Sequence, residues 1–318
     1  MREILTAGRY FKKKFGEKVY KVPISLAGFT CPNIDGTVAK GGCTFCENES
    51  FSPNLTQKTS RKFYLNPTST TNPLLEKQLL QLQHQYTTTK NKLNKKFGAE
   101  KFLVYFQSFT NTYAPLPTLK TLYNNALKLD GVVGLSIGTR TDSIDEETLE
   151  FLAELSQKHE IWVEYGIQTV YDKTLDRINR GHDVQNMIEW IEKTKKYNLK
   201  ICGHLIFGLP DETQDMMLKS VEFVNKYQLD SVKIHPMYVT KNTALAIEYK
   251  KGRFTPISEK EYADTVVKAI KMLHPSIMIQ RITAGINDNS LLAPSWCRCK
   301  HNQINNLKQE LLKHGLIY

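Results

Sequence analysis

Short apolar segments alternate with amphipathic segments along most of the chain. Seven apolar runs predict strands at residues 19–26, 101–107, 132–138, 161–168, 199–208, 231–238 and 276–282. Between them, apolar side chains recur every three or four positions and predict helices near residues 74–96, 117–129, 145–158, 183–197, 211–227 and 258–273. Strands that alternate with helices in this way form parallel sheets, because each helix carries the chain back across the sheet.

The number of strand–helix units decides between two kinds of parallel α/β fold. Six or seven units without a G-x-G-x-x-G opening favour a barrel or partial barrel over a dinucleotide-binding sheet. We expect a single domain over residues 1–318, with a core at about 19–282 and a C-terminal extension at 283–318 that ends in a helix over 302–318. The polar, Pro/Ser/Thr-rich residues 49–72 predict a mobile loop.

Composition excludes a membrane protein. No apolar run approaches 18 residues, and the first residues, MREILTAGRYFKKKFG, are mixed and charged rather than signal-like. The sequence therefore predicts a cytoplasmic location and no membrane partner. Cysteines that must stay reduced to ligate a metal also fit that compartment.

The positive charge is concentrated at the start of the chain. The formal net charge is +11, and the first hundred residues hold sixteen Lys/Arg against seven Asp/Glu. The main clusters are Lys12, Lys13, Lys14 and Lys18, then Lys58, Arg61 and Lys62, then Lys90, Lys92, Lys95 and Lys96. Such a field suits a polyanion such as RNA, whose phosphates are held by Lys and Arg. A merely solvated, lysine-rich surface is the alternative.

Three cysteines in the segment FTCPNIDGTVAKGGCTFCEN have chelating spacing. Cys43 and Cys46 form a C-x-x-C pair, and Cys31 lies twelve positions before Cys43. A zinc site would need a fourth ligand from Cys202, Cys297, Cys299 or a histidine. Three cysteines alone leave one metal corner open, which suits a [4Fe-4S] cluster whose fourth iron binds a substrate or cofactor.

This segment resembles the radical S-adenosylmethionine (SAM) superfamily, whose usual signature is C-x3-C-x2-C with an aromatic residue before the last cysteine. The longer C-x11-C-x2-C gap is similar to the branch related to the catalytic Elongator subunit, and to a bacterial subfamily of about this length. The resemblance implies an open (β/α)6 barrel, a [4Fe-4S] cluster held by Cys31, Cys43 and Cys46, and SAM as cofactor. It implies cleavage of SAM to a 5'-deoxyadenosyl radical after reduction by a donor such as flavodoxin or ferredoxin.

Several further residues match SAM-binding positions of the superfamily. Glu164 and Gln168 in E-Y-G-I-Q lie on one face of the fourth predicted strand. The resemblance implies that both contact SAM, and that Arg180 of N-R-G-H-D meets the SAM carboxylate. Its pattern also puts Gly208 and Leu209, in I-F-G-L-P, near the adenine. The Gly-Gly-Glu segment usual after the second strand is absent, so backbone carbonyls or the hydroxyls of Ser108 and Thr110 are the substitutes expected there. Capping of the following helix is the alternative role for these polar residues.

Polar residues near other strand ends are candidates for catalysis or substrate binding, because chemistry in α/β barrels lies at the carboxyl ends of the strands. These candidates are Arg140, Asp142, Lys233, His235, Arg281, Cys297 and Tyr113. For Arg140 and Asp142 a structural ion pair is the alternative to a carboxylate clamp. For Cys297 the alternatives are packing and a second metal site with Cys299.

The resemblance implies modification of the C5 side chain of the tRNA wobble uridine, from carboxymethylaminomethyl to aminomethyl. In this hypothesis tRNA docks through the basic N-terminal third, on segments that flank the cysteine loop. Two alternatives stay open: a radical SAM reaction on a small molecule or protein side chain, and a metal-dependent RNA-binding protein without turnover.

Overall fold

The computed structural model describes residues 1–47, 64–65 and 67–318. Most of the loop predicted at 49–72, with Lys58, Arg61 and Lys62, lies outside these residues. The described chain is built around one seven-stranded sheet, in which every neighbouring pair of strands is parallel. In chain order the strands are β2 (Val19–Ile24), β3 (Lys101–Phe106), β4 (Val132–Thr139), β5 (Glu160–Gln168), β6 (Lys200–Phe207), β7 (Ser231–Pro236) and β9 (Met278–Arg281). All seven predicted strands are confirmed.

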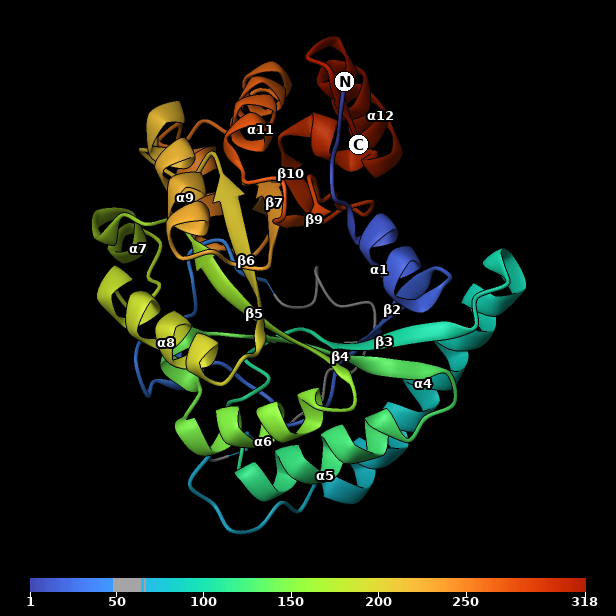
Figure 1. Cartoon of the computed structure of the whole chain (residues 1–318). Coiled ribbons are helices and arrows are strands. Elements are labelled where there is room, and N and C mark those ends of the chain that lie inside the picture. Colours follow the sequence, from blue (N-terminus) through green and yellow to red (C-terminus); the bar gives the residue numbers. More distant parts are fainter. Residues whose placement is uncertain (48–63, 66) are drawn as a thin grey trace.

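Six helices lie outside the curved sheet, one after each of the first six strands (Figure 1). They are α4 (Leu75–Phe97), α5 (Leu116–Leu127), α6 (Glu146–Ser156), α8 (Val184–Lys196), α9 (Gln214–Lys226) and α11 (Glu259–Met272). Asp145, Asp183, Thr213 and Ser258 begin four of them, and each side chain accepts a backbone N–H of the first turn. The predicted helices are therefore confirmed, with ends that shift by a few residues.

Strand order in the sheet equals chain order, with β2 and β9 at its two edges. The α/β fold is thus a partial barrel, as the resemblance implied, with seven strands rather than six. Large side chains such as Phe102, Phe106 and Phe207 are fully buried in the core. Shorter elements complete the described chain: α2 (Pro32–Asp35), η1 (Thr141–Ser143), α7 (Asp172–Arg177), β8 (Val239–Thr240) and α10 (Ala244–Lys250).

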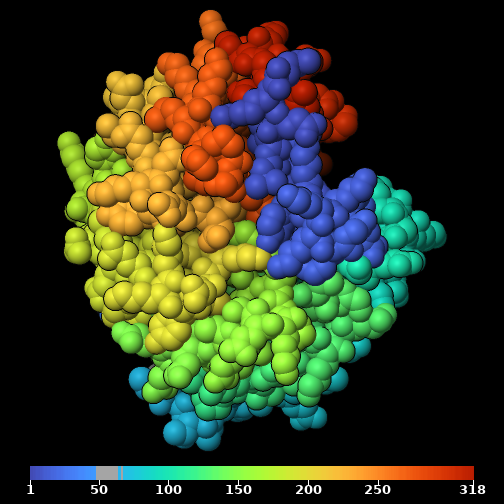
Figure 2. Space-filling view, in the orientation of Figure 1, coloured from blue at the N-terminus to red at the C-terminus, as the bar shows by residue number. Residues whose placement is uncertain are grey.

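The N-terminal helix α1 (Ala7–Phe15) is an element that the sequence pattern did not predict. Its residues AGRYFKKKF look mainly basic, but Phe11 is buried against Leu103, Trp162 and Met278. The helix thereby packs over the amino ends of the strands. Strand β1 (Arg2–Glu3) pairs with β11 (Leu316–Ile317), so the first and last residues lie together (Figures 1 and 2).

The C-terminal extension packs on the barrel instead of forming a separate unit. Strand β10 (Leu291–Ala293) pairs with β8, and η2 (Ser295–Arg298) leads into α12 (Lys300–Lys313). Helix α12 ends five residues before the predicted end, because β11 follows it. None of the helices in the described residues combines the length and apolar character needed to cross a membrane.

Candidate active site

Three cysteines from one loop line a cavity at the carboxyl ends of the strands. The loop follows β2, and Cys31 is the residue at which α2 begins; Cys43 and Cys46 come after that helix. The cavity has a volume of about 230 Å³. Other residues in its wall come from near the ends of β3 to β7: Gln107, Ser108, Thr139, Arg140, Gln168, Ile206 and His235. The predicted trio is therefore brought together at the end of the barrel where chemistry was expected.

The N-R-G-H-D segment holds the cysteine loop in place. Asn179 donates from Nδ2 to the carbonyls of Lys40 and Gly42, at 3.0 and 2.7 Å. In return Asn33 of the loop donates from Nδ2 to the Asn179 carbonyl at 2.6 Å. Gly181 has a φ of +79°, and a Cβ there would lie 2.6 Å from Asn33 Oδ1. The segment therefore needs glycine where it meets the loop.

Two arginines point a guanidinium group at the thiols. Arg140 Nη1 lies 3.7 Å from Cys31 Sγ, and Arg180 Nη1 lies 3.8 Å from Cys43 Sγ. Arg140 also donates to both carboxylate oxygens of Asp142, from Nε at 2.7 Å and from Nη2 at 2.5 Å. Burial raises the pKa of Asp142, but this pairing lowers it more, so the net pKa falls below its usual value. The structure thus contains the ion pair of the alternative, and a contact of Arg140 with a substrate carboxylate, which stays a prediction, would have to compete with Asp142.

Some buried polar atoms facing this region have no hydrogen-bond partner among the described residues. They include Gln168 Oε1 and Arg180 Nε. Gln168 ends β5 with a φ of +68°, and both residues line the cavity. An unpaired buried polar group costs free energy, so these atoms fit a polar ligand that would complete them. Ser108 also lines the cavity, with its Oγ 3.1 Å from Ser25 Oγ.

Glu164 lies at the centre of a charged network inside the barrel. Its Oε1 accepts from Lys21 at 2.5 Å and from Ser136, and its Oε2 accepts from His204 at 2.8 Å and from Lys233. Burial raises the pKa of Glu164, but Lys21, Lys233 and His204 lower it more, to well below the usual value. These contacts use about four accepting positions, which is the capacity of a carboxylate. A SAM contact by Glu164, which stays a prediction, would have to displace one of them.

His235 on β7 and Arg281 on β9 lie next to this network. Strand pairing sets Arg281 beside Lys233, and Arg281 makes no side-chain hydrogen bond or ion pair with a described residue. Burial and the charge of Arg281 lower the pKa of His235 to about 3, so its imidazole is neutral at pH 7. With Lys21 and Lys233 there are three cations here against the single carboxylate of Glu164. The interior therefore has an excess of positive charge, which favours an anionic ligand.

Comparison with known proteins decides the family. A model of the radical SAM superfamily matches residues 37–224, and a model of the radical SAM C-terminal domain matches residues 229–313. The chain belongs to the radical SAM superfamily. It is 34% identical to the Bacillus subtilis protein YtqA over 313 residues, which cover 98% of this chain and 90% of that one. The sequence resemblance is thereby confirmed, and the cofactors of the protein are a [4Fe-4S] cluster and SAM.

Two further relatives connect this radical SAM protein with the Elongator branch. A tRNA uridine(34) acetyltransferase of Methanocaldococcus jannaschii is 30% identical over 157 residues, 48% of this chain and 28% of that protein. The solved structure of Methanocaldococcus infernus Elp3 with an N-terminal deletion superimposes with a TM-score of 0.58 at 18% identity, covering 93% of this chain and 64% of that chain. This second likeness concerns the fold alone.

Among the described residues, the three loop cysteines do not lie close enough together to form a ready zinc site. Sulfur atoms around tetrahedral zinc lie roughly 3.8 Å apart, given Zn–S bonds of about 2.3 Å. Among the described residues, the trio of potential ligands within 4.8 Å of one another is Glu164, Cys202 and His204, and not the three loop cysteines. That trio is unsuited to a cation, because two lysines occupy Glu164 and burial raises the pKa of the Cys202 thiol to about 12.

Seven candidate residues lie outside the walls of the cysteine cavity: Asp142, Lys233, Arg281, Gly208, Leu209, Cys297 and Tyr113. Gly208 and Leu209 line a separate cavity of about 300 Å³, where Ile257 closes against Gly208. Cys297 is fully buried in a cluster with Tyr238 and Leu291, which fits the packing alternative, and a role near the substrate stays a prediction. Tyr113 donates to Thr37 Oγ1 at 2.8 Å and so contacts the cysteine loop. The expected adenine contact of Gly208 and Leu209 stays a prediction.

The N-terminal lysines lie at the wrong end of the barrel for the docking hypothesis. Lys14 pairs with Glu160, the first residue of β5, and Lys95 and Lys96 occupy the last turn of α4, just before β3 begins. These positions are at the amino ends of the strands, whereas the cysteines lie at the carboxyl ends. For Lys14, Lys95 and Lys96 the expectation that they flank the cysteine loop is wrong, whereas Lys58, Arg61 and Lys62 lie outside the described residues. Lysine in a last helical turn is favoured by the helix dipole, which explains part of this charge.

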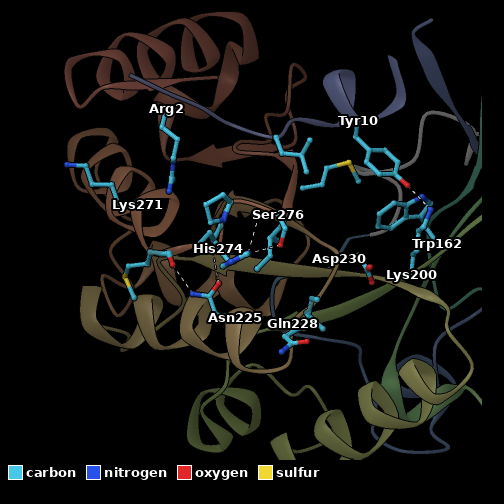
Figure 3. Close-up of a pocket in the computed structure, with 17 residues that line it drawn as sticks. Arg2, Tyr10, Trp162, Lys200, Asn225, Gln228, Asp230, Lys271, His274 and Ser276 are labelled. Carbon is cyan, nitrogen blue, oxygen red and sulfur yellow. Dashed lines mark hydrogen bonds between the residues drawn. The ribbon is translucent and has the colours of Figure 1, made fainter. Parts of the chain in front are cut away.

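A larger cavity, of about 840 Å³, also lies at the amino ends of the strands (Figure 3). Trp162, Tyr10 and Lys200 line one side, and Arg2 and Lys271 come from the chain's first residues and α11. Lys200 is already bound to Glu160 and Tyr10, at 2.6 Å each. None of the three loop cysteines lines this cavity.

Residue-by-residue inspection of the sequence missed several members of the interior network. Lys21, Ser136, His204 and Gln280 all point into the barrel and contact Glu164 or one another. A polar residue at every second position within an otherwise apolar strand was the available signal, as in K-I-C-G-H-L-I-F. That signal marks a face of the strand but does not say which residues on different strands meet.

Proposed function

We propose that this radical SAM enzyme modifies the C5 side chain of the wobble uridine in tRNA, converting carboxymethylaminomethyl to aminomethyl. Its relatives include proteins whose names state action on tRNA uridine 34. The observation that carries the proposal is the excess of cations beside the cysteine cavity, where Lys233 is buried and Lys21 and Arg281 are partly buried, because the group to be removed carries a carboxylate. Lys233 and Arg281 are the residues we assign to that carboxylate, with His235 beside them.

We assign the cofactors to the cysteine loop and to residues around the cysteine cavity. Cys31, Cys43 and Cys46 would ligate three irons of the cluster, and the fourth iron would chelate SAM. Gln168 and Arg180 supply the unpaired Oε1 and Nε for the amino acid part of SAM. When bound, these cofactors supply a 5'-deoxyadenosyl radical. Glu164, Gly208, Leu209 and Ser108 complete the proposed SAM site.

The chemistry uses the glycine-derived CH2 of the substrate. Loss of its hydrogen atom to the radical leaves a carbon radical between nitrogen and carboxylate. One electron then passes to an acceptor such as oxidised flavodoxin or ferredoxin, and the N–H proton leaves, which gives an imine. Water adds to the imine and the C–N bond breaks, releasing glyoxylate and the aminomethyl group. His235 stays neutral, with a pKa near 3, which makes it a weak base, so we assign it to hydrogen bonding with the substrate and not to proton transfer.

A basic edge beside the cysteine loop is the surface that we assign to tRNA. Helix α10 contacts the loop, since the backbone N–H of Leu245 donates to the carbonyl of Thr44 at 2.8 Å. Lys250, Lys251 and Arg253, at and after the end of α10, are exposed there. Phosphates held by these side chains would leave a flipped-out base at the mouth of the barrel.

Nucleoside mass spectrometry tests the reaction. Total tRNA from a strain lacking the gene is treated anaerobically with reconstituted enzyme, SAM and a reductant. We expect carboxymethylaminomethyluridine to decrease while aminomethyluridine, glyoxylate and 5'-deoxyadenosine increase in equal amounts. Formation of 5'-deoxyadenosine with no change in any tRNA nucleoside would instead favour a small molecule or a protein side chain as substrate.

Alanine variants test the cluster ligands. Cys31→Ala, Cys43→Ala and Cys46→Ala should each abolish SAM cleavage, and the triple variant should lose the iron and sulfide bound after anaerobic reconstitution. Cys299→Ala is the matched control, because Cys299 is exposed and outside the cavity. A triple variant that still holds four irons and four sulfides would show that the ligands are other residues.

A further inference from the structure

The two arginines at the cysteine loop have a geometry that SAM binding alone does not explain. Each directs one N–H at a cluster thiol, Arg140 Nη1 at Cys31 and Arg180 Nη1 at Cys43. Both arginines are buried, with exposed fractions of 2% and 6%. Asn33 Nδ2 also lies 3.7 Å from Cys43 Sγ. No comparable side-chain donor is found for Cys46 among the described residues.

Other contacts fix both guanidinium groups in these positions. Arg140 is held by the two oxygens of Asp142 and by the carbonyl of Arg180, which accepts from Nη2 at 2.8 Å. Arg180 donates from Nη2 to the carbonyl of Gly166 at 2.6 Å. A Cβ on Gly166 would lie 2.7 Å from Arg180 Nη2, so glycine gives this guanidinium its space. The N–H groups directed at sulfur are therefore placed by the protein before any cofactor binds.

We propose that Arg140 and Arg180 raise the reduction potential of the [4Fe-4S] cluster through N–H···S bonds to Cys31 and Cys43. Reduction adds a negative charge that is spread onto the thiolate sulfurs. Buried cations and N–H donors at those sulfurs stabilise the added charge, and such hydrogen bonds are among the factors that set cluster potentials. Asp142 is a positioning residue, because it orients the guanidinium of Arg140. The inference rests on the proposed ligand assignment and is independent of the substrate.

The experiment is a redox titration of the reconstituted protein without SAM, followed by electron paramagnetic resonance of the reduced cluster. Arg140→Gln and Arg180→Gln each remove the charge and the Nη1 donor and keep a shorter polar side chain. Each should lower the equilibrium constant for one-electron reduction about tenfold, which is about 59 mV. Arg177→Gln is the matched control, because Arg177 is paired with Glu248 and does not line the cavity; its potential should equal that of the wild type.

Iron and sulfide analysis separates this inference from the ligand assignment. Glutamine variants with full clusters and wild-type potentials would overturn the role of the arginines while leaving the cysteines in place. Should the glutamine variants lose iron, Arg140→Lys and Arg180→Lys, which keep the charge but not the fixed fork of donors, are titrated instead. We expect their potentials to fall below the wild-type value; wild-type potentials in the lysine variants would also overturn the proposal.

Discussion

At the scale of single residues, the site combines groups that the barrel brings from different strands. Arg140 was expected as a possible carboxylate clamp, yet Asp142, a neighbour two positions away, already occupies it. Lys233 and Arg281 lie on adjacent strands; Lys233 is paired with Glu164, so Arg281 is the cation better placed for a substrate. Whether a charged side chain here can bind a substrate depends on whether a neighbouring residue already pairs with it.

Arg180→Ala should weaken SAM binding roughly ten- to a hundredfold, because a charge-assisted hydrogen bond contributes about 1.5 to 3 kcal/mol. Binding is measured by equilibrium dialysis with the cluster reconstituted and its iron quantified. Arg177→Ala should leave the affinity unchanged. Equal SAM affinity in Arg180→Ala and the wild type would remove Arg180 from the SAM site.

Two partly buried histidines should make the apoprotein sensitive to acid. Burial lowers the pKa of His204 to about 4 and of His235 to about 3, below the ordinary value of 6.5. The unfolded chain therefore binds protons first as the pH falls. The contribution of the two neutral histidines to the free energy of unfolding is therefore complete above about pH 6.5, and it is lost progressively towards pH 4 and below.

Between pH 7 and pH 4.5 the free energy of unfolding should fall by about 1 to 3 kcal/mol for each of these histidines. Urea unfolding of wild type and His235→Gln at both pH values measures it. The variant should lose less stability on acidification than the wild type, and His84→Gln, on the exposed side of α4, should lose as much as the wild type. Parallel losses in His235→Gln and the wild type would contradict the assigned pKa.

At the scale of elements, α1 closes the barrel at the end away from the chemistry. Phe11 is only 3% exposed and packs among inward side chains of four strands, including Leu103, Trp162 and Met278. Tyr10, Lys14 and Lys200 surround the carboxylate of Glu160 beside it. Lys14 is thus part of the fold and not of a free basic surface.

Phe11→Ala should lower the free energy of unfolding by about 3 to 5 kcal/mol, because it removes a buried aromatic ring and leaves a cavity. Urea denaturation of the apoprotein gives the value. Leu80→Ala on α4 is the control, since Leu80 is 67% exposed and should change stability by less than about 0.5 kcal/mol. A decrease below about 1 kcal/mol in Phe11→Ala would mean that α1 is only loosely docked.

At the scale of the whole molecule, basic residues at both ends of the barrel provide two candidate surfaces for tRNA that can be compared. Lys250, Lys251 and Arg253 lie at the cysteine end, and Lys92, Lys95 and Lys96 lie at or near the other. Both sets are exposed and carry the same charge. Replacing either set by glutamate therefore changes the net charge equally.

The glutamate triple variant of Lys250, Lys251 and Arg253 should weaken tRNA binding and make it less sensitive to salt. The slope of log affinity against log salt should decrease by about 0.7 to 0.9 for each phosphate that the variant no longer neutralises. The matched variant of Lys92, Lys95 and Lys96 should change both quantities much less. Filter binding over a range of salt concentrations measures the two slopes, with SAM cleavage as a check on the active site. A larger effect from the second set would place tRNA at the amino ends of the strands.

The sequence by itself determined the parallel α/β architecture and the cysteine trio. Alternation of strands and helices is a local property, because each apolar run needs only its own periodicity to be recognised. The spacing of Cys31, Cys43 and Cys46 is likewise local, since a loop of that length can place all three ligands without help from the rest of the chain. These features could be predicted before any contact between distant segments was known.

Only the tertiary structure decided which polar residues meet and at which end of the barrel each one lies. Lys21 and Gln280 belong to opposite edges of the sheet, yet curvature brings Lys21 Nζ within 2.6 Å of Gln280 Oε1 and 2.5 Å of Glu164 Oε1. The basic residues of the first third of the chain are close together in sequence. Strand β2 nevertheless carries the chain from one end of the barrel to the other, so Lys14 lies at the amino ends of the strands and the cysteine loop at the carboxyl ends. Closure of a sheet sets distances between strands, and those distances leave no periodic signal in the residues themselves.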